Sequence, residues 1–184
     1  PITVTFTGAG DAGSGIKEVR LWAKKGAAGA WEDTGLAVPA ESGAFTYAAA
    51  TGDSTYFFAL RAEDNAGNFS AIPAGVGEAC TLLDTTPPSP GVLSSPPLTN
   101  GDSVEIEYHG VHDAGSGPKE VRLWVKRGGT GAWQDTGLRS RLPEGEFTFS
   151  RGGADGLCYF CIQAVDNAGL ASPEPYDELV FGGG

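Results

Sequence analysis

The sequence contains two copies of one unit. The stretch "DAGSGIKEVRLW" at Asp11–Trp22 returns as "DAGSGPKEVRLW" at Asp113–Trp124, 102 residues later. The same shift holds without a gap from Asp11–Ser70 to Asp113–Ser172, and 31 of these 60 positions are identical. Gapless identity over this length indicates two copies of one fold, so a structure or function argued for one copy can be checked against the other.

Within each copy the hydrophobic residues alternate with polar ones, which is typical of half-buried β-strands. Ile2, Val4 and Phe6 alternate with threonines near the start of the first copy. Further strands are predicted around 19–23, 31, 45–47 and 56–62, and in the second copy around 91–95, 104–108, 121–125, 158–164 and 179–181. The 29 glycines and 12 prolines supply turns, and no stretch has helical spacing. The fold class predicted is therefore all-β.

The stretch "DTTPPSPGVLSSPP" (Asp84–Pro97) separates the copies. Its prolines favour extended backbone, so it is predicted to be a stiff linker that becomes a strand. We therefore expect two domains, 1–84 and 85–184, the first without its opening strand. About seven strands in about 100 residues, with frequent turns, indicate an immunoglobulin-like β-sandwich.

Composition excludes several classes of function. The net charge is −11, shared as −5 over 1–84 and −6 over 85–184, which would repel nucleic acid and attract cations. No run of 18 apolar residues could span a membrane. No Ser-His-Asp or paired-acid arrangement occurs at matching positions, and His109 and His112 occur only in the second copy, where solvated loop positions are expected. An enzyme is not predicted.

The three cysteines are not expected to form a site. Cys158 and Cys161 lie three residues apart on one strand and so point to opposite faces, which disfavours a disulfide between them. The count of three leaves at least one of Cys80, Cys158 and Cys161 unpaired within the chain. An intermolecular disulfide remains open.

Two acidic turns recur in each copy, "DAGSG" and "DNAG". In a sandwich with strands that run alternately up and down, both turns lie at one end, and the segment that starts at Asp84 reaches the same end. Carboxylate, amide and backbone oxygens are the ligands that Ca²⁺ prefers, and glycines 115, 117 and 169 would let backbone carbonyls turn inward. The predicted calcium ligands are Asp84, Asp113, Asp166 and Asn167 in the second copy, and Asp11, Asp64 and Asn65 in the first.

The first-copy site is expected to be incomplete, because no residue of the sequence precedes Pro1 to match Asp84. An alternative explains the same residues without a metal. Asp, Asn and Gly are the ordinary residues of turns, since an Asx side chain bonds nearby backbone and glycine allows positive φ. The spacing is not that of an EF-hand.

The repeated pattern resembles the bacterial immunoglobulin-like or fibronectin type III-like repeats of large secreted and cell-surface proteins. The matching residues are Ser14-Gly15, Trp22, Trp31, Tyr56, Phe58, Asp64–Asn68 and Asp84–Pro88. The resemblance implies an extracellular or cell-surface location, tandem stacking and, in several branches, calcium between domains. The second copy departs from it at Cys158, which brings a tyrosine-corner hydrogen bond into question. It departs again at Leu170, in place of the final Asn, which is expected to weaken one contact beside the metal.

The predicted function is a non-enzymatic structural or adhesive segment of a surface protein, stiffened by Ca²⁺ at the domain junction, with neighbouring repeats as partners. One alternative is a glycan- or protein-binding accessory module of a secreted enzyme that uses exposed aromatic and cationic side chains. The residues predicted for that surface are Arg20, Trp22, Phe57, Arg122, Trp124 and Tyr159. Another alternative is a self-assembling fibre subunit whose open first domain accepts a strand from a neighbouring chain.

Overall fold

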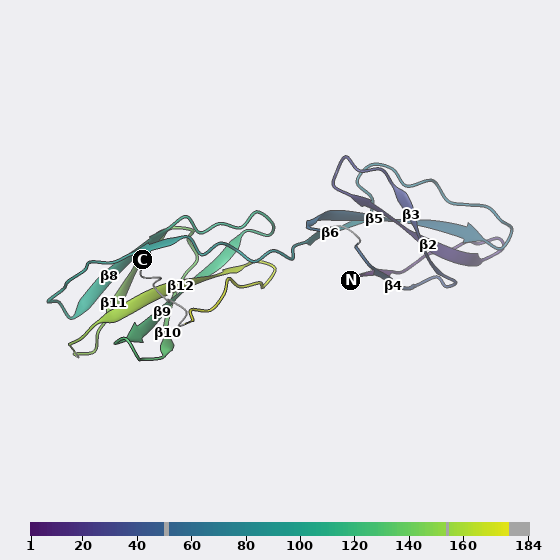
Figure 1. The fold of residues 1–184 in the computed structure, drawn as a ribbon. Helices are drawn as coiled ribbons and strands as arrows, with labels where there is room; N and C mark the ends of the chain where they lie inside the picture. Colours follow the sequence, from purple (N-terminus) through teal and green to yellow (C-terminus); the bar gives the residue numbers. More distant parts are fainter. Residues whose placement is uncertain (50–51, 154, 177–184) are drawn as a thin grey trace, which may run out of the picture. The chain divides into compact units, whose positions relative to one another are not determined.

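Every regular element of the described chain is a β-strand, which confirms the all-β prediction (Figure 1). The computed structural model describes residues 1–49, 52–153 and 155–176. The chain divides into two compact units, Pro1–Asp84 and Thr85–Gly184. Within the described residues, no helix has the length and apolar character needed to cross a membrane.

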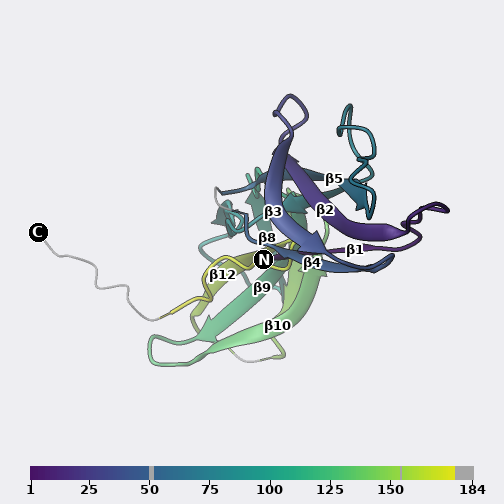
Figure 2. The ribbon, with the colours of Figure 1, turned by 90° about the vertical axis from the view of Figure 1, so that its right-hand side faces the viewer.

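The first unit has six strands in two sheets. They are β1 (Ile2–Phe6), β2 (Ile16–Lys25), β3 (Glu32–Val38), β4 (Gly43–Tyr47), β5 (Ser54–Asp64) and β6 (Ala79–Leu83). One sheet has the order β3-β2-β5-β6, and β1 pairs with β4 in the other. Figure 2 shows β1 and β4 beside β2 and β3. All pairings within these sheets are antiparallel.

Alternation along the strands places the core of the first unit between its sheets. Ile2, Val4 and Phe6 of β1 are 6–8 % exposed, while the threonines between them are exposed. They pack with Phe45 of β4 and with buried side chains of β2 and β5 in one hydrophobic cluster. The two sheets therefore share a core, as in a β-sandwich.

The second unit repeats this plan. Its strands are β7 (Val92–Ser94), β8 (Ser103–His109), β9 (Pro118–Arg127), β10 (Trp133–Ser140), β11 (Gly145–Ser150) and β12 (Cys158–Asp166). They form two antiparallel sheets of order β11-β8-β7 and β10-β9-β12. The strand predicted near 91–95 is thus β7, and the one predicted near 179–181 lies outside the described residues.

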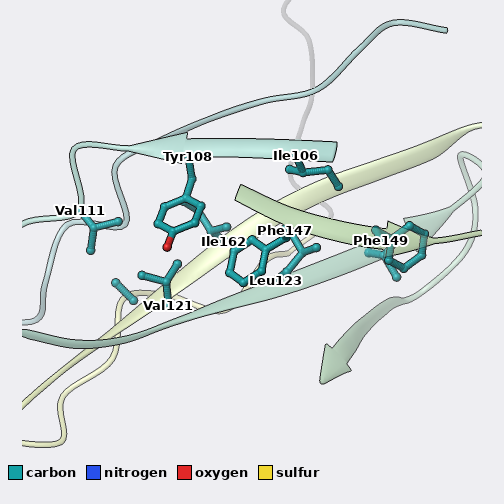
Figure 3. Close-up of a cluster of buried hydrophobic side chains, with 10 residues drawn as sticks. Ile106, Tyr108, Val111, Val121, Leu123, Phe147, Phe149 and Ile162 are labelled. Carbon is teal, nitrogen blue, oxygen red and sulfur yellow. The ribbon is translucent and has the colours of Figure 1, made fainter. Parts of the chain in front are cut away.

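One cluster of aromatic and aliphatic side chains fills the second unit. Figure 3 shows Tyr108, Phe147 and Leu123 between the strands that carry them. The rings of Tyr108 and Phe147 are stacked with centroids 5.0 Å apart. Leu123 and Ile106 have no exposed surface. Burial of side chains from both sheets accounts for the sheets packing face to face.

The resemblance brought a tyrosine-corner hydrogen bond into question at Cys158, which stands where the first copy has Tyr56. The buried Tyr56 donates a hydrogen bond from its hydroxyl to the carbonyl of Gly52 at 3.1 Å. Cys158 packs at the edge of the second core and has no hydroxyl for such a bond. All three cysteines, Cys80, Cys158 and Cys161, are free thiols in this chain.

Candidate metal centre

The two acidic turns of each unit lie side by side, as predicted. In the second unit the side-chain amide of Asn167 donates to the carbonyls of Ser116 and Gly117, both at 3.0 Å. In the first unit Asn65 makes the corresponding bonds to Ser14 and Gly15. Each asparagine therefore clamps the turn after its own strand to the turn before β2 or β9.

Backbone pairing also fixes the segment that leads into the second unit. Ser89 and His112 exchange two backbone hydrogen bonds, of 2.8 and 3.2 Å, and form an isolated antiparallel bridge. His112 directly precedes Asp113, and Ser89 lies five residues after Asp84. The bridge holds the extended, proline-rich segment beside the loop that carries Asp113.

Asp84, Asp113 and Asp166 form a carboxylate cluster. One carboxylate oxygen from each lies within 4.8 Å of those of the other two. Asp166 has no exposed surface, and Asp84 and Asp113 are each 9 % exposed. The three come from distant parts of the sequence: Asp84 directly follows β6, Asp113 lies in the β8–β9 loop and Asp166 ends β12.

The carboxylate of Asp166 is only half satisfied by hydrogen bonds. Its Oδ1 accepts from the backbone N–H of Leu170 at 2.8 Å. Its Oδ2 is buried and has no hydrogen-bond donor among the described residues. A buried charged oxygen without a partner raises the free energy of the folded state, and a bound cation would remove that cost.

The geometry and chemistry of the cluster fit a hard divalent cation. Three carboxylates this close repel one another, and a divalent ion between them would reverse that interaction. Oxygens about 2.3–2.6 Å from a Ca²⁺ ion lie up to about 5 Å from each other across it, which matches the spacing of the cluster. An all-oxygen set disfavours the softer metals that prefer thiolate or imidazole.

Asp113 Oδ2 accepts from the backbone N–H of Gly117 at 2.6 Å, but the corresponding carboxylates of the first unit accept more hydrogen bonds. Asp11 Oδ2 accepts from the backbone N–H groups of Gly13, Ser14 and Gly15 at 2.7–3.1 Å. Asp64 Oδ1 accepts two backbone N–H bonds, and its Oδ2 accepts from the side chain of Asn68 at 2.8 Å. Hydrogen bonding, first of all by Asn68, lowers the pKa of Asp64. These carboxylates are satisfied by turn chemistry, the alternative left open by the sequence.

The structure places the remaining predicted ligands in other roles. The amide groups of Asn65 and Asn167 hold the turns together, as described above. Gly117 has φ +82°, and its carbonyl accepts from both the backbone and side-chain nitrogens of Asn167. Gly169 also has a positive φ, of +91°. The inward-facing carbonyls at 115, 117 and 169 stay a prediction.

The predicted partner surface lies on the sheets that contain β2 and β9. Arg20 pairs with Glu18 at 2.6 Å, and Arg122 pairs with Glu120 at 2.7 Å. The half-buried Trp22 has the guanidinium of Arg61 6.0 Å from its ring. Both predicted arginines and Trp22 therefore already have partners within the chain.

Lysines lie near two of the other predicted aromatic side chains, Phe57 and Tyr159. Lys24 lies 5.2 Å from the ring of Phe57, and Lys126 lies 5.9 Å from that of Tyr159. Lys24 is 7 % exposed and donates to the carbonyls of Ala27 and Gly75. Trp124 is half-buried, and its indole nitrogen, like that of Trp22, is buried without an acceptor among the described residues.

Leu170 was expected to weaken one contact beside the metal, and this stays a prediction. Its counterpart Asn68 donates to Asp64 Oδ2 at 2.8 Å, a bond that a leucine side chain cannot make. The signal was the difference between the "DNAGN" and "DNAGL" stretches, but its meaning depends on the folded turn. The hydroxyls of Ser14 and Ser116 were missed as well: each accepts from a backbone N–H of the opposite turn.

Comparison with known proteins adds no family to this description. The sequence matches no known protein-family model and no curated protein. Function is therefore inferred from the geometry of the chain itself.

Proposed function

We propose that the chain is a non-enzymatic, extracellular structural or adhesive segment of a surface protein. It is built from two tandem immunoglobulin-like, fibronectin type III-like β-sandwiches, and the second binds Ca²⁺ through Asp84, Asp113 and Asp166. The strand orders β11-β8-β7 and β10-β9-β12 support the fold assignment, because sequential strands are distributed between two sheets in the manner of that sandwich.

One observation carries the metal assignment. Asp166 is fully buried, its Oδ2 has no hydrogen-bond donor among the described residues, and two further carboxylates lie within 4.8 Å. Calcium supplies the missing positive charge and prefers these ligands. The predicted glycan-binding alternative has weaker support, because Arg61, Lys24 and Lys126 already lie near three of its four aromatic side chains.

Calcium acts mechanically in this proposal. Asp84 follows β6 by one residue and precedes the proline-rich segment, so an ion bound by Asp84, Asp113 and Asp166 ties that segment to two loops of the second unit. The linker loses conformational freedom when the ion binds. A surface protein made of such units would be stiffer in the calcium-containing extracellular medium than in its absence.

Thermal unfolding tests the metal assignment. Because an ion that binds only the folded state stabilises it, about 2.7 kcal/mol at 100 times Kd, calcium raises the melting temperature of the second unit by several degrees and EDTA reverses the rise. Asp166→Asn removes the response. Glu107→Gln, an equal change of charge at an exposed position of β8, keeps it. A melting temperature that calcium leaves unchanged in the wild-type chain contradicts the proposal.

The fibre alternative has one observation in its favour. Within the described residues β1 pairs only with β4, whereas its counterpart β8 pairs with both β11 and β7. A strand from a neighbouring chain added along β1 would give the first unit the same three-stranded sheet. Sedimentation over a range of concentrations tests this function: self-association supports it, and a monomer at all concentrations contradicts it.

A further inference from the structure

We propose that the residue four positions after the last aspartate of β5 or β12 controls whether that aspartate can bind a cation. Leucine at 170 leaves the carboxylate of Asp166 to the ion, whereas asparagine at 68 takes the place of the ion on Asp64. The inference rests on the proposed calcium site and names the side chain that controls it.

The two turns have the same backbone, so the side chains at 68 and 170 can be compared directly. In both turns the aspartate N–H donates to the carbonyl of that residue at 3.0 Å. In both turns the N–H of that residue donates to the aspartate Oδ1 at 2.8 Å. The Oδ1 of each aspartate therefore accepts this backbone bond, and Asp64 Oδ1 accepts a second one from the N–H of Ala66 at 2.9 Å.

The other carboxylate oxygen, Oδ2, has different hydrogen-bond partners in the two units. In the first unit the Nδ2 of Asn68 donates to Asp64 Oδ2 at 2.8 Å. In the second unit the side chain of Leu170 has no donor, and Asp166 Oδ2 is left without one among the described residues. The side-chain amide of asparagine carries positive hydrogens to the very oxygen that a cation would use.

Because Asp166 is buried, its missing hydrogen-bond donor affects stability. Asp64 is half-buried, but Asp166 has no exposed surface, so water cannot replace the missing donor of Asp166 as it could at an open turn. Replacing Asn by Leu alone would be expected to destabilise such a turn. It becomes favourable where a divalent ion, held also by Asp84 and Asp113, contacts the unpartnered Oδ2 of Asp166.

Leu170→Asn tests the inference, because the same asparagine already fits the same turn at position 68. The variant should weaken calcium binding at least tenfold in isothermal titration of the full chain. Its melting temperature in EDTA should exceed that of the wild type, because Asp166 Oδ2 gains a donor. Leu170→Ile, which changes shape without adding a donor, should keep the wild-type affinity and show no such rise.

The outcomes separate this inference from the proposed function. A wild-type chain that binds no calcium overturns both. A wild-type chain that binds calcium, with Leu170→Asn binding equally well, overturns the role of residue 170 alone. Equal weakening by Leu170→Asn and Leu170→Ile also overturns it, because packing rather than the amide would then be responsible. No gain in calcium-free stability for Leu170→Asn contradicts the predicted hydrogen bond.

Discussion

A buried carboxylate requires donors, a cation or a proton, and Asp64 and Asp166 show how one side chain nearby changes the requirement. Asp64 receives hydrogen bonds on both oxygens, whereas Asp166 receives them on Oδ1 only. The two aspartates occupy matching positions of the repeat. Their hydrogen bonding differs because the residue four positions later is asparagine in one copy and leucine in the other. The proposed calcium site follows from that difference rather than from the number of acidic residues.

The ion pair between Asp135 and Arg139 leads to a pH prediction. Arg139 donates to Asp135 at 2.8 Å and, as the largest cause, lowers the pKa of Asp135 to about 2. Because this pKa lies below the unfolded value of about 3.9, the pair stabilises the fold fully above about pH 4 and loses that effect as the pH falls through 2. The pair is partly exposed, so we expect a contribution of about 0.5 kcal/mol after solvent screening.

Acid unfolding of Asp135→Asn measures this contribution. The variant should be less stable than the wild type at pH 6, with a difference that shrinks toward pH 2. Asp33→Asn is the matched control, because Asp33 stands at the equivalent position but has only a 3.4 Å contact with Arg20. A difference between wild type and Asp135→Asn that stays constant from pH 6 to pH 2 disproves the assignment.

At the scale of strands, much of the fold could be predicted from alternation. The spacing of Ile2, Val4 and Phe6 predicted β1 and the face that it buries, because side chains alternate across a strand. The second-unit strand near 91–95 was predicted instead as the continuation of the extended, proline-rich linker. The convergence of the acidic turns followed from strand order, since connections that alternate in direction return to the same end.

The chemistry of the site could be predicted only in part. Asp84, Asp113 and Asp166 followed from topology, but the Asn167 clamp and the saturation of Asp11 depend on side-chain and backbone directions within the turns. These directions are set by hydrogen bonds that many turn sequences could make. Sequence alone therefore located the candidate ligands without separating the two units by their hydrogen bonding.

Strand β5 gives a prediction about its anchoring hydrogen bond. Tyr56→Phe keeps the buried ring but removes the hydroxyl that donates to Gly52, so the free energy of unfolding of the first unit should fall by about 1 kcal/mol. Tyr159→Phe makes the same chemical change on a side chain that is 41 % exposed and should have little effect. Chemical denaturation of both variants measures the difference, and equal effects would show that the buried bond adds nothing.

At the scale of the whole molecule, the proposal concerns the freedom of the segment after Asp84. Calcium should raise the steady-state heteronuclear NOE of the backbone amides of Thr85 and Thr86 in NMR relaxation experiments, because the bound ion restrains the residue before them. Asp166→Asn should lose this response while keeping its folded spectrum. Identical values with calcium and with EDTA in the wild type would mean that ion binding does not stiffen the segment.

The most direct measurement of the central claim is isothermal titration of the full chain with Ca²⁺. The account predicts one ion per chain, because only Asp84, Asp113 and Asp166 form such a cluster among the described residues. It predicts that Asp166→Asn loses the binding and Glu107→Gln retains it. No binding up to about 10 mM calcium, well above the weakest dissociation constants of extracellular calcium modules, would contradict the account, as would undiminished binding by Asp166→Asn.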